Sequence, residues 1–462
     1  MVDGTQRMRT GFRLLASGQW LSWFGDAFGP IALAVAIVAG GGSASELGLV
    51  MAATMAARLA CTLVGGIWAD RVAPQRIMVV SDLVRAATTF ATAAYFATGQ
   101  HSLTLLCALA ATTGGAAAFF GPAFVSLRPM LVAPERRQAA NATLNILQNG
   151  AFIAGPAAAG VFVAGVGAPW AFGVNAVSFL VSAATVALIR AEAPRSARTG
   201  MLAELREGWR EVRTRDWLLA GLLAATAYHA ALGAITVLID VIAVRDLGGP
   251  TALGWISAAA GVGGLGGGLL AMRFKPRRPL LVGWPCVALM ALYAASFAWP
   301  GRLTAVLCAA LVGFAGLMFF SVCWDTALQD GVPHTVLARV SSWDILTSFV
   351  AIPAGNALAG PLARAVGTGP VIVVGAVVMA LASFAPMLVR GSRDLRRAGT
   401  PVLRPAGPTL RRRALGRAEG GRPEVGQPDP PNGCPGDWSV LRWLRRAPRP
   451  WRARTARGAW PG

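Results

Sequence analysis

The chain alternates long apolar runs with short arginine-bearing turns about a dozen times before residue 390. Runs such as 30–40, 49–68 and 168–189 contain at most one charged residue each. A helix that crosses a bilayer needs ~20 mostly apolar residues, at a rise of ~1.5 Å each, to span ~30 Å of hydrocarbon. A soluble domain of this length cannot cover so many helices that are apolar on every side. The sequence therefore predicts an all-α integral membrane protein with many transmembrane helices.

The composition agrees with this class. Hydrophobic residues make up 55% of the chain and charged residues 14%, and the mean hydropathy is +0.55. The net charge of +21 alone would suggest a nucleic-acid partner, but 17 of the 42 basic residues lie from Arg390 onward and most others lie in short loops. We therefore expect no nucleic-acid partner. Five of the six cysteines lie in apolar runs, which favours packing over disulfides or a metal site.

Twelve spans are predicted, at residues 13–40, 46–68, 77–98, 102–126, 141–165, 169–190, 217–244, 252–272, 279–299, 303–328, 340–363 and 368–389. One set of alternate loops carries seventeen Arg or Lys residues, whereas the opposite set carries only Arg245, Arg302 and Arg364. Basic loops face the cytoplasm. Both termini are therefore expected in the cytoplasm, with the protein in the plasma membrane.

The two halves of the predicted bundle repeat each other. Phe119-Phe120 recurs as Phe319-Phe320, an offset of 200, and Gly155-Pro156 recurs as Gly360-Pro361, an offset of 205. Such a duplication is typical of transporters that bind their substrate near the midplane, between the halves. The predicted organisation is a cytoplasmic N-terminus at 1–12, six-helix bundles at 13–190 and 217–390, a cytoplasmic linker at 191–216 and a disordered basic tail at 391–462.

The linker contains one amphipathic segment. Its apolar residues Leu202, Leu205, Trp209 and Val212 recur at helical spacing, and Glu211 can pair with Arg215 four positions later. We expect a short helix that lies on the cytoplasmic membrane surface. The tail is rich in Pro, Gly and Arg without any sustained period, which indicates disorder.

Asp26 is the most informative of the charges inside the spans. It follows Arg13 by thirteen residues, which places it ~20 Å along the first helix. A carboxylate at that depth costs ~2.5–3.5 kcal/mol on insertion scales, so it should face a cavity or a partner. Two roles are open for it. It is either a functional group that couples protons or binds a charge on the substrate, or a structural carboxylate that accepts hydrogen bonds from Ser22 or Gln19.

Other intramembrane groups are alternatives or accessories to Asp26. Asp240 in the seventh span and Asp325 near the cytoplasmic end of the tenth are the remaining candidates for proton coupling. Asp82 and Arg85, one turn apart, are predicted to form an ion pair at the cytoplasmic end of the third span. A lone histidine in a span, such as His229, is more often hydrogen-bonded filler than a proton relay.

The turn after the second span reads GIWADRVAPQR, from Gly66 to Arg76. This sequence resembles the cytoplasmic G-x-x-x-D-R-x-x-x-R motif of the major facilitator superfamily. Glycine allows neighbouring helices to approach closely, and an aspartate there can pair with an arginine or cap a helix. Such a network locks one conformation and breaks in the other. The predicted gating residues are Gly66, Asp70, Arg71, Arg76, Asp82 and Arg85.

Further segments strengthen the resemblance over about residues 10–390. FFGPAFVSLRPMLVAPERRQAANATLNI, GPAAAGVFVAGVGAPWAFGVNAVSFLVSA and GMLAELREGWREVR are similar to the actinobacterial branch that includes enterobactin-exporter-like and macrolide-efflux-like proteins. Gly150, Gly155, Pro156 and Gly160 resemble the antiporter motif of the fifth helix. Small residues at this spacing also explain close helix packing without any role in export, so only the resemblance connects them to antiport.

The predicted function is secondary active transport, by alternating access, of a small organic molecule such as a drug, siderophore or secondary metabolite. The resemblance implies export in exchange for protons, no cofactor, no enzymatic activity and a monomer in the bilayer. An importer on the same fold is the first alternative, and a membrane-bound enzyme is the second. The enzyme would need a cluster of catalytic or metal-binding side chains, but His101, His229 and His334 lie far apart in sequence.

Overall fold

The computed structural model describes residues 2–69, 72–189, 201–299 and 301–396. Its contacts divide the chain into one unit at Met1–Thr400 and a second at Pro401–Gly462, and every described residue belongs to the first unit. All regular elements within the described residues are helices. This confirms the predicted all-α class. Since the hydrocarbon of a bilayer offers no hydrogen bonds to the backbone, helices satisfy their peptide groups internally.

Seven helices form the N-terminal group. They are α1 (Val2–Asp26), α2 (Phe28–Ala39), α3 (Ala44–Ala69), α4 (Pro74–Ala97), α5 (Leu103–Leu127), α6 (Arg137–Val166) and α7 (Ala168–Ala187), with short 3-10 turns at Arg128–Met130 and Pro134–Arg136. Local sequence sets several of the ends. Pro74 begins α4 at a position where its missing N–H is not needed, and the Ser102 hydroxyl caps α5 by accepting from the Leu105 N–H.

The C-terminal group follows the linker helix α8 (Met201–Arg213). Its helices are α9 (Asp216–Asp246), α10 (Pro250–Arg273), α11 (Pro279–Val287), α12 (Leu289–Ala295), α13 (Leu303–Gly331), α14 (His334–Val366), α15 (Thr368–Phe384) and α16 (Arg390–Asp394), with a 3-10 turn at Ala385–Leu388. Thus α16 occupies the first residues of the predicted tail. The remainder of that predicted tail, from residue 397, lies outside the described residues.

The predicted twelve spans correspond closely to the helices found. Eleven described segments are long and apolar enough to cross a bilayer, counting α1 and α2 as one span from Thr10 to Ala39. The predicted ninth span is the shorter apolar segment Pro279–Ala295, which is interrupted at Ala288 between α11 and α12. Pro285 lies in this segment. Proline removes one helical hydrogen bond and disfavours a continuous helix.

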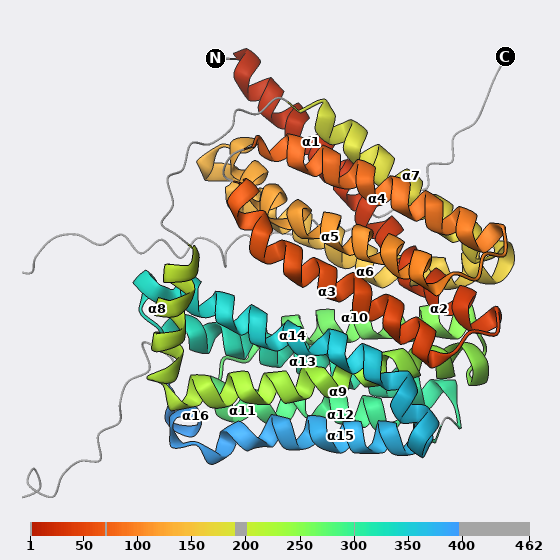
Figure 1. The fold of residues 1–462 in the computed structure, drawn as a ribbon. Helices are drawn as coiled ribbons and strands as arrows, with labels where there is room; N and C mark the ends of the chain where they lie inside the picture. The colour runs from red at the N-terminus through yellow and green to blue at the C-terminus, as the bar shows by residue number, and fades with distance from the viewer. Residues whose placement is uncertain (1, 70–71, 190–200, 300, 397–462) are drawn as a thin grey trace, which may run out of the picture. The chain divides into compact units, whose positions relative to one another are not determined.

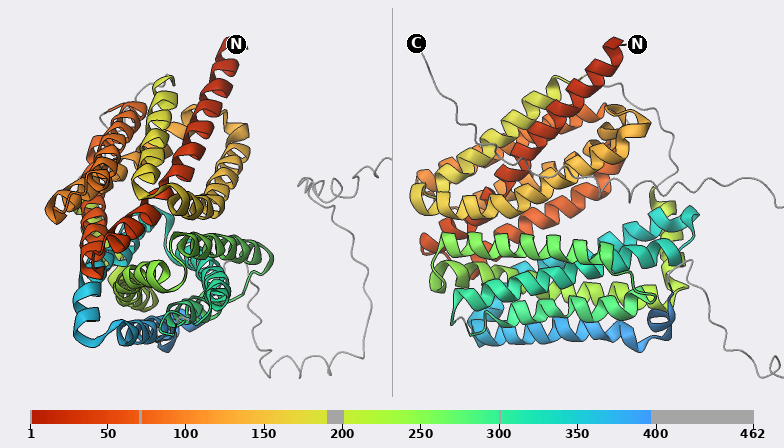
Figure 2. Two further views of the ribbon diagram at one scale, coloured as in Figure 1. Left: turned by 90° about the vertical axis from the view of Figure 1, so that its right-hand side faces the viewer. Right: turned by 180° about the vertical axis from the view of Figure 1, so that it is seen from behind.

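Figures 1 and 2 show the N-terminal helices and the C-terminal helices as two groups that lie against each other. The backbone also carries the repeat predicted from the sequence. Gly167 ends α6 with φ +103°, and Gly367, two hundred positions later, ends α14 with φ +89°. Glycine adopts this conformation without the steric penalty of a side chain. Each is followed at once by the next membrane helix, α7 or α15.

Glycines also set the closest packing inside the C-terminal group. The run of glycines at 261–268 lies within α10 and forms a packing surface. A Cβ on Gly263 would collide with the backbone of Leu311, and one on Gly267 would collide with the backbone of Ala315. The absence of side chains there lets α10 approach α13 at backbone distance, which increases van der Waals contact between membrane helices.

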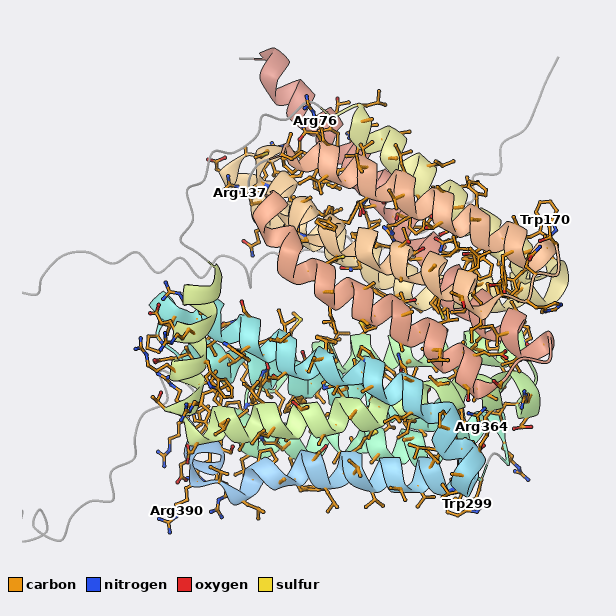
Figure 3. The ribbon with its side chains drawn as sticks, in the orientation of Figure 1. Arg76, Arg137, Trp170, Trp299, Arg364 and Arg390 are labelled. Atoms are coloured by element: carbon orange, nitrogen blue, oxygen red, sulfur yellow. The ribbon has the colours of Figure 1, made fainter. Side chains whose placement is uncertain are left out.

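The two ends of the bundle differ in charge. Figure 3 shows Arg76, Arg137 and Arg390 at the end that carries α8, and Trp170, Trp299 and Arg364 at the other. We call these the linker end and the far end. The α8 helix packs on α14 at the linker end: Arg339 Nη1 lies 2.7 Å from Glu207 Oε1, and the rings of Trp209 and Trp343 are 4.8 Å apart.

The predicted pairing inside the linker is confirmed, since Arg215 Nη1 lies 2.7 Å from Glu211 Oε1. The apolar face of α8 covers protein rather than lipid in its described part. Val212 is completely buried. Arg215 also donates to the Gly331 carbonyl at the end of α13. The linker helix is therefore fixed to the C-terminal group by polar and aromatic contacts.

Candidate functional site

Asp26 lies at a break in the first membrane helix. The α1 helix ends at Asp26 and α2 begins at Phe28. Pro30 explains the position of the break, because it has no N–H to bond the Asp26 carbonyl four residues earlier. The Asp26 side chain is 41% exposed and lines a large cavity. The carboxylate is therefore held near the middle of the span, within reach of solvent.

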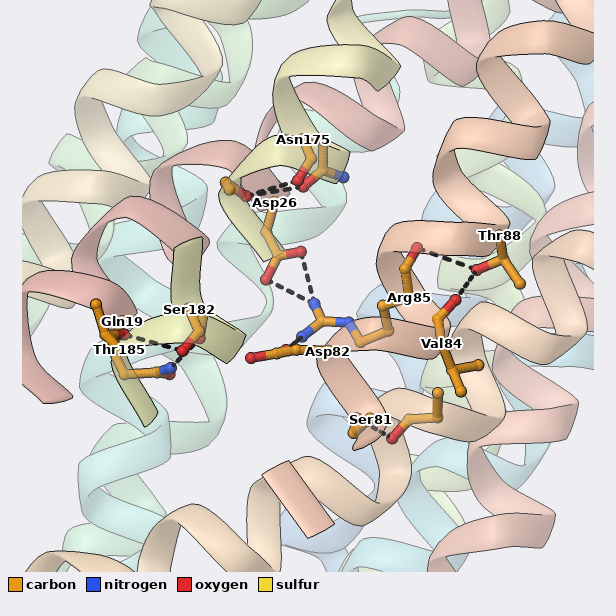
Figure 4. Close-up of polar contacts among 12 residues, drawn as sticks. Gln19, Asp26, Ser81, Asp82, Val84, Arg85, Thr88, Asn175, Ser182 and Thr185 are labelled. Carbon is orange, nitrogen blue, oxygen red and sulfur yellow. Dashed lines mark hydrogen bonds and ion pairs between the residues drawn. The ribbon is translucent and has the colours of Figure 1, made fainter. Parts of the chain in front are cut away.

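Arg85 on α4 joins this carboxylate to a second one. Its Nη2 lies 2.7 Å and 3.0 Å from the two carboxylate oxygens of Asp26, and its Nη1 lies 3.2 Å from Asp82 Oδ1 (Figure 4). Asp82 is fully buried, and the Arg85 side chain is 9% exposed. A buried guanidinium needs such charge-assisted hydrogen bonds to offset its desolvation.

Two aromatic rings hold the guanidinium in place. Arg85 Cζ lies 3.8 Å from the centroid of the Phe179 ring and 5.7 Å from that of Phe120. Cations are attracted to the faces of aromatic rings, more strongly when both partners are desolvated. The cluster contains two carboxylates and one guanidinium. Among the described side chains no other cation pairs with Asp26 or Asp82, so one negative charge is left over when both are ionised.

The cavity beside this cluster has a volume of about 820 Å³ and is lined mainly by apolar side chains. Most of its wall belongs to the N-terminal group, and α9 and α14 close the other side. The polar lining residues are Gln19, Ser22, Asp26, Thr54, Arg58, Arg85, Thr89, Thr92, Thr113, Gln148, Asn175, Thr236, Asp240 and Asn356. Such a pocket, apolar with a few charged groups, suits a small amphipathic molecule.

Helices of the two groups meet closely at the far end. A Cβ on Gly48 of α3 would collide with the Asn356 carbonyl of α14, and one on Gly360 would collide with Ser45. The Arg245 guanidinium donates to the Gly42 carbonyl at 3.0 Å. Figure 1 shows α3 and α14 diverging from this end toward the linker end. The far end of the cavity is therefore closed by contacts in which the backbones of helices from the two groups approach each other closely.

The glycine motif of the fifth span takes part in this closure. Gly160 and Gly254 face each other, and a Cβ on Gly160 would lie 2.6 Å from the Pro250 carbonyl oxygen. A Cβ on Gly155 would lie 2.8 Å from Ala27 Cβ, at the break in the first span. Pro156 is buried within α6. Gly150, in contrast, is exposed and has no described atom within 4 Å of such a Cβ.

The structure changes the roles expected for Asp26, Asp82 and Arg85. Gln19, proposed as a partner that would satisfy Asp26, instead donates to the Ser182 hydroxyl at 2.9 Å. The predicted Asp82–Arg85 pair is present, but its place is different. Arg85 lies near the middle of α4 (Pro74–Ala97) and not at its end, because the helix begins three residues before the predicted start. The pair therefore belongs to the Asp26 cluster.

Of the two remaining candidates for proton coupling, one lines the cavity and the other does not. Asp240 lines the cavity, and no hydrogen bond or ion pair is found for it among the described residues. Asp325 is exposed on α13 and does not line this cavity, to which α13 contributes no residue. His229 Nδ1 lies 2.8 Å from the Ala225 carbonyl oxygen, as expected for a hydrogen-bonded filler. Asp26 and Asp240 are the two carboxylates that line the cavity.

The expected network at the turn between the second and third spans cannot be placed in full. Asp70 and Arg71 lie outside the described residues. Gly66 belongs to the last turn of α3, and Arg76 is exposed in the first turn of α4. Their role in gating remains a prediction from the sequence.

Arg58 and Asn356 line the cavity but were not among the candidate site residues predicted from the sequence. Arg58 is exposed toward the cavity from α3, and its presence in a membrane span is a signal that could have pointed there. Asn356 is 3% exposed, and its Oδ1 has no hydrogen-bond partner in the described structure. In sequence, one asparagine in a span gives no such signal. No cluster of three or more potential metal ligands was found in the part of the chain described.

Comparison with known proteins agrees with this architecture. The profile of the Major Facilitator Superfamily matches residues 15–355. The multidrug efflux pump Tap of Mycolicibacterium fortuitum is 28% identical over 381 residues, covering 78% of this chain and 91% of that protein. The multidrug efflux pump Tap of Mycobacterium tuberculosis is 28% identical over 361 residues, covering 74% and 84%.

Solved structures show the same fold. A bacterial homologue of the human lysosomal transporter Spinster, in an inward-facing conformation, matches with a TM-score of 0.65 and 17% identity, covering 85% of this chain and 99% of that one. A bacterial homologue of the iron transporter ferroportin, also inward-facing, matches with a TM-score of 0.65 and 17% identity, covering 83% and 98%. At this level of identity the likeness concerns the fold alone.

Proposed function

Because the chain belongs to the Major Facilitator Superfamily, we propose that it exports a small organic molecule in exchange for protons, with Asp26 as the proton-exchanging group. The similarity to multidrug efflux pumps supports export. The volume and apolar lining of the cavity support an amphipathic substrate. Transport would follow alternating access, in which the two helix groups rock about a binding site between them.

The Asp26–Arg85–Asp82 cluster is the observation that carries this proposal. Two carboxylates share one guanidinium at the wall of the cavity. In a low-dielectric site the leftover negative charge favours the binding of one proton or one substrate cation. Asp26 is the exposed member of the cluster and Asp82 the buried one. Proton and substrate would therefore compete at Asp26, which is the basis of antiport.

A proposed orientation of the chain in the membrane supports outward transport. We propose that the linker end is cytoplasmic, because basic side chains such as Arg76, Arg137 and Arg390 gather there. The far end, closed by Gly48–Asn356 and Gly360–Ser45, would then face outward. In this orientation the cavity would be closed on the outer side, and its helices would diverge toward the cytoplasm. A substrate could then enter the cavity from the cytoplasm before export. Protonation of Asp26 from outside would release the substrate after rearrangement.

Everted membrane vesicles test the proposal. With an acidic interior imposed, they should accumulate an amphipathic fluorescent cation such as ethidium, and dissipation of the pH gradient should stop accumulation. Asp26→Asn keeps the shape but removes the titrating group. It should abolish gradient-driven accumulation while downhill exchange continues, because only coupling is lost.

Asp325→Asn is the matched control, since this carboxylate is exposed outside the cavity. It should accumulate the dye like the parent protein. Gradient-driven accumulation at parental rates in Asp26→Asn would refute the role of Asp26 and move attention to Asp240. Accumulation that occurs only in right-side-out vesicles would instead identify an importer on the same fold.

A further inference from the structure

The C-terminal group contains a second, smaller cavity of about 110 Å³. Its wall comes from α9, α11, α13, α14 and α15, so it lies inside one helix group. It shares no lining residue with the large cavity. Any molecule that binds there would occupy a site distinct from the one proposed for transport.

Aromatic rings form a continuous part of this wall. The ring centroids of Trp284 and Phe320 are 4.6 Å apart, those of Trp284 and Trp324 are 5.8 Å apart, and those of Phe320 and Trp324 are 6.2 Å apart. All three side chains line the cavity. Aromatic faces grouped in this way bind substituted ammonium and guanidinium ions through their quadrupoles.

A carboxylate accompanies the rings. Asp344 of α14 lines the cavity, and its two oxygens accept from Trp324 Nε1 at 3.2 Å and 3.1 Å. No Arg, Lys or His pairs with Asp344 in the described part of the chain, so its only described hydrogen-bond donor is neutral. A carboxylate held at this depth without a counter-ion is a favourable position for a cation.

Two further polar groups of the wall have no partner. Tyr228 is 6% exposed and Trp284 is 4% exposed, and the Tyr228 hydroxyl and Trp284 Nε1 are buried without a hydrogen bond in the described structure. A buried donor without an acceptor costs free energy. An indole N–H only donates. The occupant should therefore carry a hydrogen-bond acceptor, such as a hydroxyl or carbonyl oxygen, in addition to a positive charge.

The internal repeat explains why a cation fits here. Phe320 and Ser383 line the cavity at offsets of 200 and 201 from Phe120 and Ser182, which lie around the Asp26 cluster. There, the guanidinium of Arg85 lies over aromatic rings and pairs with carboxylates. No charged residue occurs in α11 or α12. The C-terminal half thus has rings and a carboxylate but lacks the built-in cation.

We propose that this cavity binds a small organic cation that carries a neutral oxygen acceptor, as an amino alcohol does. The cationic nitrogen lies against Trp284, Phe320 and Trp324 and is neutralised by Asp344. The oxygen accepts from Trp284 Nε1 and Tyr228. The ligand occupies the place that the Arg85 guanidinium fills in the other half.

Choline is a suitable probe because it combines a trimethylammonium with a hydroxyl. Binding of radiolabelled choline to the purified full-length protein in detergent should be saturable. Unlabelled tetramethylammonium should compete more weakly, since it lacks the oxygen. The carbon isostere, in which a tert-butyl group replaces the trimethylammonium, should not compete. Equal competition by that neutral isostere, or the absence of saturable choline binding, would overturn the proposal.

Variants locate the site. Asp344→Asn should weaken choline binding by about tenfold or more, because it removes the counter-charge. Asp325→Asn, which changes a nearby exposed carboxylate on α13, should leave it unchanged. Asp26→Asn is measured beside it to detect any choline that binds in the large cavity. Trp284→Phe keeps a ring but removes one of the two donors, so the preference for choline over tetramethylammonium should fall while Tyr228 remains.

Size-exclusion profiles establish that each variant remains folded. Parental choline affinity in Asp344→Asn would refute the role assigned to that carboxylate. Loss of choline binding in Asp26→Asn would show that choline occupies the large cavity, and this outcome also overturns the proposal. A preference for choline over tetramethylammonium as large in Trp284→Phe as in the parent would contradict the assignment of the oxygen to the indole.

Discussion

Arg85 binds two carboxylates that come from different helices of the N-terminal group. Asp82 lies on its own helix α4, and Asp26 lies at the break between α1 and α2. The strength of each contact depends on the other, because a guanidinium offers several donors in a fixed geometry. If Asp26 exchanges a proton, as proposed, Arg85 would retain Asp82 as its partner. The proton would then change the contact between α4 and the first span without leaving the cation unpaired.

Arg85→Gln should destabilise the protein strongly. It leaves Asp82 buried without its cation, and loss of one partner of a buried ion pair costs about 3–5 kcal/mol. The thermal unfolding midpoint in detergent should fall accordingly. Adding Asp82→Asn removes the orphaned charge, so the double variant should regain part of the lost stability. If the double variant is no more stable than Arg85→Gln, electrostatic pairing is not what Arg85 contributes.

At the scale of helices, glycine positions determine how closely the two groups meet. Gly160 of α6 and Gly254 of α10 lie at backbone contact, with a Cβ on Gly254 placed 3.0 Å from Gly160 Cα and 2.6 Å from the Pro156 carbonyl oxygen. Neither neighbour can move aside, since both are backbone atoms. Close packing at this interface therefore requires glycine on both helices.

Gly254→Leu should act as a wedge that opens the far end. Spin labels at Gln100 and Arg302, exposed loop positions in the two halves, should move apart when measured by double electron–electron resonance. Gly266→Leu on the same helix is the control, because a Cβ there meets no described atom within 4 Å. A parental distance distribution in Gly254→Leu would show that this interface does not control closure.

The helices could be predicted from the sequence more fully than the site. The length and polarity of the apolar runs determine the spans, and a repeat offset such as Phe120 to Phe320 indicates two related halves. The Asp26–Arg85 contact could not be predicted, because it joins residues 59 positions apart on helices whose mutual rotation depends on packing. The sequence singled out Asp26 as a candidate but placed Arg85 near the end of its helix, because the predicted helix start was three residues late.

Across the whole molecule, the distribution of charge and the closure of the bundle bear on the proposed orientation in the membrane. Arg76, Arg137 and Arg390 lie at the linker end, and Arg364 lies at the far end. Because basic side chains are retained on the cytoplasmic side during insertion, this asymmetry predicts that the linker end faces the cytoplasm. The orientation of the protein determines the side of the membrane from which the cavity can be reached. A single topology measurement therefore tests both.

Reporter fusions should settle the orientation. A green fluorescent protein fused after Arg396, just beyond α16, should fluoresce, since this reporter matures in the cytoplasm. Alkaline phosphatase inserted at Gln100, between α4 and α5, should be active because that loop would be external. As a paired control, the reporters are exchanged between the two positions and should both be silent. Active phosphatase after Arg396 together with fluorescence at Gln100 would invert the protein in the membrane. The conformation described here would then be open to the outside, and loading from the cytoplasm would require the opposite state.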